Sequence, residues 1–239
     1  MKEEPWYVSA FQSGYRTVYP HRDLESARRE VGYLLERGVA GRVLDLACGF
    51  GRHSIALLAA GLDVSGIDLS ADLLADAPDS LAGRLARADI RHLPFADASF
   101  DAVVNLFSSF GYFAEEDDGA VLDEIARVLR PGGRAILDLM NPDRIRAGLV
   151  PESRTERDGI VLEERRSLSS DGRRVRKEVR LTLPGEAART WTEDVRMYGT
   201  AELQALAEPR GLRLHAVEGG FDGSSFGPES ERQIVHLSR

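Results

Sequence analysis

Short apolar runs alternate with amphipathic stretches between Arg42 and Met140. The apolar runs predict strands, and the stretches between them, with apolar positions three and four residues apart, predict helices. The predicted strands cover residues 43–47, 63–67, 84–88, 101–107 and 133–139, and the helices cover residues 52–60, 71–77 and about 117–129. Apolar strands that alternate with helices are typical of a parallel sheet buried on both faces, so we predict a doubly wound α/β fold.

Past the fifth predicted strand the pattern changes. Residues 155–167 and 173–184 are strand-like stretches on either side of a Ser-Asp-Gly turn. The second alternates Val175, Val179, Leu181 and Leu183 with polar side chains, which predicts a half-buried antiparallel strand with one face in water. A third strand is predicted near residues 190–198. We assign residues 142–197 to a β-rich insertion, which we expect to cover the substrate or to contact a second copy of the chain.

The remaining residues, 1–141 and 198–239, are assigned to the core. Asp23 and Ser70 are expected to cap helices, as is Thr200, after which LRLHAVEG and QIVHLS supply two further strands. Residues 1–22 are rich in aromatic side chains but have no helix or strand period. They either pack across the edge of the core or form a lid over a ligand.

Composition limits the classes of function. The 239 residues carry a formal charge of −8 at pH 7, which disfavours a general nucleic-acid binder because phosphates are held by basic surfaces. No apolar run approaches the roughly 20 residues that span a bilayer, and the N-terminus lacks the apolar core of a signal peptide. The single cysteine, Cys48, excludes an internal disulfide and a multi-cysteine metal site. We therefore expect a cytoplasmic protein that binds no DNA, no membrane and no metal.

The stretch VLDLACGFGRHS, residues 43–54, reads as a buried strand, a tight glycine turn and the start of a helix. Asp45, Gly49 and Gly51 then lie at the carboxyl end of a strand, where open α/β sheets bind ligands. Asp68 ends the next strand, and its carboxylate can accept hydrogen bonds from both hydroxyls of a ribose. This arrangement predicts a site for an adenosine-type nucleoside.

A nicotinamide dinucleotide could bind at the same edge of such a sheet. Its G-x-G-x-x-G motif would require glycine at Ser54, and a carboxylate at Asp45 would repel a pyrophosphate. Asp45 could instead hold an ammonium group. The inferred ligand therefore has a ribose and a cationic amino-acid tail but no phosphate, and an NAD-dependent oxidoreductase is the less favoured alternative.

These residues resemble the first motif of class I S-adenosylmethionine-dependent methyltransferases, with Ala47 in place of the first glycine of D-x-G-x-G-x-G. The resemblance continues through GIDLS, which contains Asp68, through ADI at 88–90, FDAVVNLFSSFGYF and LRPGG, and covers about residues 15–141. It implies a Rossmann-like sheet of seven strands, the antiparallel seventh being residues 233–238. It also implies S-adenosylmethionine as the cofactor.

By this resemblance Asp68 would bind the ribose, Asp89 and Ile90 the adenine edge, and residues 105–107 the methionine side. The full set of expected cofactor contacts is Tyr15, Asp45, Ala47, Cys48, Gly49, Gly51, Asp68, Leu69, Asp89, Ile90, Asn105, Leu106 and Phe107. Cys48 is expected to fill space under the glycine turn rather than to act as a nucleophile. Asp68→Ala is predicted to lower cofactor affinity at least about tenfold while leaving the thermal midpoint of the ligand-free protein nearly unchanged.

The acceptor is less constrained by the sequence. Methyl transfer needs an in-line nucleophile and a dry site, and it needs a base only if the acceptor must lose a proton. Weak candidates for a base are His21, Tyr112 and Tyr198, for each of which structural packing or an exposed position is favoured over catalysis. The aromatic stretch 107–113 lacks an N-P-P-Y type sequence and favours a small, partly apolar or amine acceptor.

We therefore predict a methyltransferase that acts on a nitrogen or oxygen of a small molecule, as a monomer or homodimer. The alternatives are a catalytically silent S-adenosylmethionine-binding protein and, less favoured, a protein or RNA methyltransferase.

Overall fold

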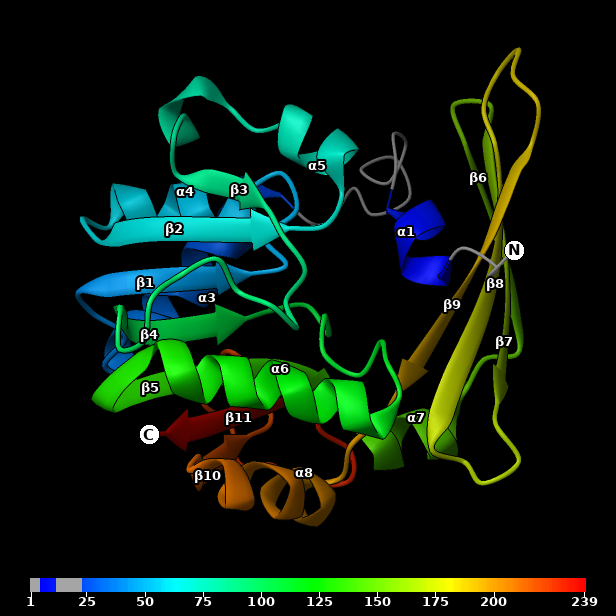
Figure 1. Cartoon of the computed structure of the whole chain (residues 1–239). Coiled ribbons are helices and arrows are strands. Elements are labelled where there is room, and N and C mark those ends of the chain that lie inside the picture. The colour runs from blue at the N-terminus through cyan, green and yellow to red at the C-terminus, as the bar shows by residue number, and fades with distance from the viewer. Residues whose placement is uncertain (1–4, 12–22) are drawn as a thin grey trace.

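The computed structural model describes residues 5–11 and 23–239, and its named strands form two sheets (Figure 1). Seven strands form sheet A in the order β10-β11-β5-β4-β1-β2-β3, and four form sheet B in the order β6-β7-β8-β9. Strands β1 to β5 run parallel, whereas β11 is antiparallel to both of its neighbours, β5 and β10. The predicted α/β fold with a seven-stranded sheet and a β insertion after the fifth strand is confirmed.

The strands of sheet A are β1 (Arg42–Leu46), β2 (Asp63–Asp68), β3 (Leu85–Arg87), β4 (Phe100–Asn105), β5 (Leu129–Met140), β10 (Arg213–Glu218) and β11 (Arg232–Ser238). The helices that accompany them are α3 (Leu24–Glu36), α4 (Arg52–Ala59), α5 (Ala71–Ala75), α6 (Glu115–Val128) and α8 (Thr200–Ala207), with 3-10 turns at Asp79–Leu81 and Glu208–Arg210. Strand β5 begins earlier than the sequence predicts, because Leu129 already pairs with Phe100 before a bulge.

Helices cover both faces of sheet A, and each face has its own apolar core. One core packs α3 and α4 on the sheet through Val31, Leu34, Val43, Leu57 and Val104. The other packs α6 and α8 on the opposite face through Leu44, Val103, Leu122, Leu137 and Leu203. Since neighbouring residues of a strand point to opposite faces, burial on both sides explains why these strands are almost continuously apolar.

Sheet B consists of β6 (Glu152–Arg157), β7 (Ile160–Leu168), β8 (Arg174–Thr182) and β9 (Arg189–Arg196), all antiparallel. The prediction of a single strand over 155–167 is wrong, because Asp158 (φ 52°) and Gly159 (φ 78°) form a tight turn that divides it into β6 and β7. Asp-Gly is the turn pair that hairpins favour. The sequence analysis predicts the turn at Asp171-Gly172 but not the one at Asp158-Gly159, although both contain the Asp-Gly pair.

Several local features differ from the sequence predictions. Helix α1 (Trp6–Ala10) forms in the aromatic segment that showed no period, and α7 (Pro142–Gly148) follows β5 with Asn141 as its N-cap. The predicted caps Asp23 and Ser70 are confirmed, since their side chains accept hydrogen bonds from the backbone N–H groups of Ser26 and Leu73. The cap of α8 is Gly199, and Thr200 is already the first helical residue.

Figure 1 shows α1 between the carboxyl edge of sheet A and the inner side of sheet B. Its position places Tyr7 and the following Phe11 beside residues at the ends of the parallel strands. In the described part of the chain, no helix combines the length and apolarity needed to cross a membrane.

Candidate active site

The turn after β1 brings backbone amide groups to the carboxyl edge of sheet A. Asp45 lies within the end of β1, and the chain then turns through Ala47 (φ 58°) and Gly49 (φ 59°) into α4. Gly51, the N-cap of α4, has φ 81°, and a Cβ at this position would overlap the buried side chain of Leu81. The loop therefore requires glycine here to direct the N-terminus of α4 toward the edge of the sheet.

Asp68 stands at the end of β2, opposite this turn. Its Oδ2 accepts a hydrogen bond from the Gly49 N–H at 2.8 Å, and its Oδ1 accepts one from the Ser70 N–H at 2.8 Å. Burial raises the pKa of Asp68, and the two hydrogen bonds oppose that rise by stabilising the carboxylate. A carboxylate oxygen has a second lone pair, so both oxygens can also accept a ribose hydroxyl.

Asp45 is only 1% exposed, and its Oδ2 accepts a hydrogen bond from Ser54 Oγ at 2.6 Å. Burial raises the pKa of Asp45, and the nearby His53 and Arg52 together with the Ser54 hydroxyl oppose the rise. Ser54 occupies the position where a dinucleotide motif would have its third glycine. Here its hydroxyl orients the carboxylate that lies in front of the glycine turn.

Arg52 is a residue of this site that the sequence analysis treated only as the start of a helix. Its side chain is 6% exposed, and Nη1 reaches Glu30 Oε2 at 3.1 Å and Ser26 Oγ at 3.2 Å. Its Nη2 is buried and has no hydrogen-bond partner among the described residues. A buried guanidinium nitrogen without a partner is costly, and a carboxylate is the group whose geometry satisfies it best.

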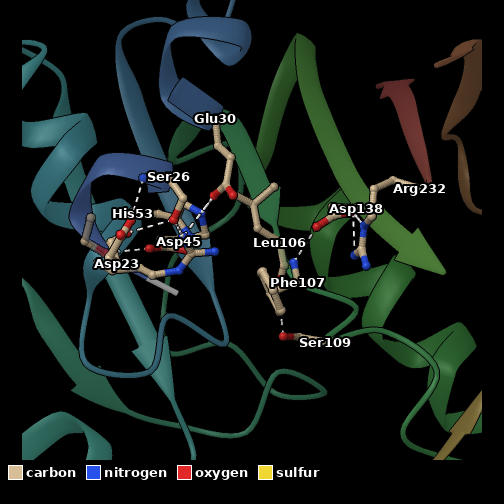
Figure 2. Close-up of polar contacts among 12 residues, drawn as sticks. Asp23, Ser26, Glu30, Asp45, His53, Leu106, Phe107, Ser109, Asp138 and Arg232 are labelled. Atoms are coloured by element: carbon tan, nitrogen blue, oxygen red, sulfur yellow. Dashed lines mark hydrogen bonds and ion pairs between the residues drawn. The ribbon is translucent and has the colours of Figure 1, made fainter. Parts of the chain in front are cut away.

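Glu30 of α3 holds both basic residues at the start of α4. Its Oε2 lies 2.5 Å from His53 Nε2 and 3.1 Å from Arg52 Nη1. Burial opposes ionisation of Glu30, but its contacts with His53 and Arg52 more than compensate, so its pKa is lowered. Figure 2 shows Glu30 and His53 meeting beside Asp45, which places a network of charged groups at one end of the site.

These residues border one cavity at the carboxyl edge of sheet A. Most of the expected cofactor contacts line it, and the described residues of the lining are Tyr7, Phe11, Asp45, Ala47, Cys48, Gly49, Phe50, Arg52, His53, Asp68, Leu69, Leu73, Asp89, Ile90, Leu106, Phe107, Ser109, Tyr112 and Phe113. Among the described residues, two expected contacts are not in this lining. Gly51 lies behind the turn, and Asn105 is buried beneath it with its Nδ2 donating to the Leu46 carbonyl at 3.1 Å.

Asp89 and Ile90 form the wall of the cavity that follows β3. Arg91 binds the Asp89 carboxylate through Nη2 at 2.7 Å and Nε at 3.1 Å. Burial opposes ionisation of Asp89, but these bonds outweigh it and lower its pKa. Cys48 is buried in the turn after β1, where burial and the charges of Asp45 and Asp68 raise the pKa of its thiol, so a reactive thiolate is disfavoured.

Aromatic side chains from two distant segments close the other end of the cavity. Tyr112 stacks on Phe11 with ring centroids 5.7 Å apart, and Tyr7 packs edge-on against Phe113 at 5.1 Å. The Phe11 carbonyl accepts a hydrogen bond from Ser70 Oγ at 2.5 Å. This bond joins the C-terminal end of α1 to Ser70. Ser70 lies two residues after Asp68, the residue expected to bind the ribose.

The structure separates the three candidate bases. Tyr112 lines the cavity, whereas Tyr198 is buried elsewhere and donates a hydrogen bond to Asp118 Oδ2 at 2.9 Å. Burial and the Asp118 charge raise the pKa of Tyr198, which fits a structural role. His21 and the expected cofactor contact Tyr15 lie outside the described residues. No group of three or more potential metal ligands occurs among residues 5–11 and 23–239.

Comparison with known proteins agrees with this geometry. A family profile described as a methyltransferase domain matches residues 43–133. The chain is 31% identical over 191 residues to dTDP-3-amino-3,4,6-trideoxy-alpha-D-glucopyranose N,N-dimethyltransferase of Streptomyces venezuelae, covering 77% of this chain and 80% of that protein. It is 32% identical to the cypemycin N-terminal methyltransferase of a Streptomyces species, covering 85% of each.

Solved structures show the same fold over nearly the whole chain. DesVI of Streptomyces venezuelae superposes with a TM-score of 0.70 at 27% identity, covering 93% of this chain and 95% of that one. An S-adenosylmethionine-dependent methyltransferase of Clostridium acetobutylicum superposes with a TM-score of 0.80 at 17% identity, covering 94% and 95%. The second likeness concerns the fold alone.

Proposed function

Because this chain belongs to the S-adenosylmethionine-dependent methyltransferases, we propose that it transfers a methyl group to a nitrogen or oxygen of a small molecule. The observation that carries the proposal is a single cavity with two unlike ends. One end holds the carboxylates Asp45 and Asp68 beside Arg52, whose Nη2 has no partner among the described residues, and the other is walled by aromatic rings. The first end suits a nucleoside with an amino-acid tail, and the second suits a compact, partly apolar acceptor.

Each part of the cofactor has a complementary group in this cavity. We assign the ribose hydroxyls to Asp68, the adenine edge to Asp89 and Ile90, the ammonium group to Asp45 and the carboxylate to Arg52. Asp45 and Arg52 together match the opposite charges of an amino acid. The bound cofactor supplies a methyl group on a positively charged sulfur, so the protein needs to orient the acceptor and exclude water rather than activate the donor.

A nitrogen acceptor is the form of this proposal that we favour. The two relatives named above act, by their names, on an amino sugar nucleotide and on a peptide N-terminus. A neutral amine attacks without help from a base, so this form of the proposal does not depend on Tyr112 or His53, two side chains of the described lining that could take up a proton.

The proposal extends to the elements around the cavity. Residues 1–22 would act as a lid, of which α1 is the described part, and residues 142–197 would cover the acceptor side. We expect the protein to work in the cytoplasm as a monomer or homodimer and not to use DNA as a substrate, in keeping with its net charge of −8.

Calorimetry with S-adenosylhomocysteine tests the cofactor site, and a panel of acceptors with methyl-labelled S-adenosylmethionine tests the transfer. The panel should contain amino sugar nucleotides, free amines, peptides with a free N-terminus, phenols and sugar hydroxyls. We expect binding, with labelled product appearing among the amines. Absence of binding would exclude the proposal.

Binding without transfer to any member of the panel would favour a catalytically silent cofactor-binding protein.

A further inference from the structure

Two adjacent residues of the cavity edge have an unusual backbone conformation. Phe107 has φ 70° and Ser108 has φ 58°, and they are the only neighbouring non-glycine residues with positive φ in the described part of the chain. The left-handed region is disfavoured for residues with a Cβ, and consecutive residues in it persist only where their surroundings enforce it. Phe107 lines the cavity, so this strained turn lies at the site itself.

Asp138, near the end of β5, holds the backbone of both strained residues. Its Oδ2 accepts the Phe107 N–H at 2.8 Å, and its backbone carbonyl accepts the Ser108 N–H at 2.9 Å. Asp138 is 1% exposed, so few water molecules compete for these bonds. The buried Asp138 thus fixes the backbone of the 107–108 turn.

Arg232, the first residue of β11, completes the arrangement. Its Nε donates to Asp138 Oδ1 at 2.6 Å, and its Nη2 donates to Ser108 Oγ at 2.8 Å. Its guanidinium carbon lies 5.6 Å from the centre of the Phe107 ring, while that of Arg52 lies 5.0 Å from the same centre. Figure 2 shows Asp138 and Arg232 on the side of Phe107 opposite to the Glu30–His53 group.

We propose that Asp138 and Arg232 are positioning residues for methyl transfer. They hold the 107–108 turn in its left-handed form and so set where the Phe107 ring stands in the cavity beside Arg52. The proposal rests on the proposed function, because the ring lines the cavity beside Arg52, the group assigned to the cofactor carboxylate. A merely structural ion pair would join β11 to β5 without affecting catalysis.

The first test measures kcat, the acceptor KM and S-adenosylhomocysteine affinity for Asp138→Asn and Arg232→Lys, all well below the melting temperature. We expect Asp138→Asn to lower kcat at least about thirtyfold and cofactor affinity about threefold to tenfold, with a smaller loss for Arg232→Lys. The control is Glu231→Gln, whose exposed side chain lies 3.9 Å from Arg144. Unchanged kcat and affinity in both variants, with lowered stability only, would overturn the proposal.

The second test relieves the strain directly. Glycine adopts positive φ without a steric penalty, so Ser108→Gly should restore part of the kcat lost in Asp138→Asn, by at least about threefold. It should also reduce the loss of thermal stability caused by Asp138→Asn, measured as a double-mutant cycle without ligand. Additive effects on stability in that cycle would contradict the proposal that Asp138 holds the 107–108 turn, even if the protein bound no cofactor. Failure of the wild-type protein to bind S-adenosylhomocysteine would contradict the proposed function instead.

Discussion

The two ends of the cavity are held in place in different ways. At the cofactor end, Asp68 is fixed by the backbone N–H groups of Gly49 and Ser70, all within one strand–turn–helix–strand unit. At the acceptor end, the loop after β4 is held from remote parts of the chain. Arg174 of β8 donates to the Phe113 carbonyl at 3.0 Å, and the Arg196 N–H of β9 donates to the Gly111 carbonyl at 2.7 Å.

This difference predicts that the two ends respond differently to substitutions elsewhere in the chain. A site made of backbone groups and glycine turns depends on a short, continuous sequence. A loop supported by side chains from sheet B and β11 can change its shape when those distant elements change. We therefore expect substitutions at the two ends to affect cofactor and acceptor separately, and the following predictions test that separation.

The largest effect is expected at Arg52. Arg52→Met removes the group assigned to the cofactor carboxylate, so S-adenosylhomocysteine affinity should fall about fiftyfold, as expected for charged hydrogen bonds worth about 1.5 to 3 kcal/mol each. Binding of 5′-methylthioadenosine, which has the nucleoside but no amino-acid tail, should stay within about twofold of wild type. Calorimetry with both ligands measures the contrast.

Arg29→Met is the control for Arg52→Met, because Arg29 forms an exposed pair with Glu25 on α3. An equal loss of affinity for both ligands in Arg52→Met would show that the substitution disturbs the whole site and that Arg52 does not recognise the tail.

Asp68→Ala should weaken both ligands by at least about tenfold, since both contain the ribose. The structure also changes the expectation for stability. Asp68 accepts two backbone hydrogen bonds, so its removal leaves two donors without their partner and should lower the thermal midpoint of the ligand-free protein by about 2 to 4 °C. Calorimetry and thermal unfolding measure the two effects; cofactor affinity within twofold of wild type would remove Asp68 from the ribose role.

Arg174→Met tests the acceptor end by itself. Loss of the bond to the Phe113 carbonyl should raise the acceptor KM about fivefold and leave S-adenosylhomocysteine affinity within about twofold. Steady-state kinetics with an acceptor from the panel provides the measurement. Arg176→Met, an exposed residue of the same strand that pairs with Glu178, is the control. A fall in cofactor affinity as large as the rise in the acceptor KM would show that the two ends of the cavity do not act separately.

The smallest effect concerns pH. Because burial raises the pKa of Asp45, the folded state takes up a proton more readily than the unfolded chain, and the charged carboxylate destabilises the fold at neutral pH. Asp45→Asn should therefore raise the thermal midpoint of the ligand-free protein at pH 7 by about 2 to 4 °C. This gain should shrink as the pH falls through the raised pKa toward the ordinary value of 3.8.

Thermal unfolding of both proteins between pH 7 and pH 4 provides the data for Asp45→Asn. A difference that is constant across this range would show that burial does not act on the ionisation of Asp45. Asp45→Asn should also weaken S-adenosylhomocysteine binding. The charged carboxylate of Asp45 would then lower the stability of the ligand-free fold and stabilise the bound ligand.

Much of the cofactor end could be predicted from the sequence because its determinants are local. Asp45, Gly49 and Asp68 follow strands with clear apolar periods, and their turn chemistry is visible in the chain itself. Arg52 could not be assigned in this way, because its burial and its partly satisfied guanidinium depend on Glu30, which belongs to the preceding helix. An arginine directly after the glycine turn was the only signal in the sequence.

The acceptor end was less accessible for the same reason. The aromatic stretch 107–113 was recognised, but its conformation is set by Asp138 and Arg232, whose contact spans 94 positions of the chain. No period or turn signal connects such residues. The short helix α1 was missed because five residues are too few to show a helical repeat, and its stability comes from packing on Tyr112 and β9.

The position of Arg232 in β11 has a consequence for synthesis on the ribosome. A nascent chain that ends before this strand already contains the glycine turn, Asp45 and Asp68, but it lacks the partner of Asp138. Such a chain could gather the residues for the nucleoside before the turn at 107–108 is fixed. The chain would then become able to transfer a methyl group only when β11 inserts between β5 and β10 and completes the sheet.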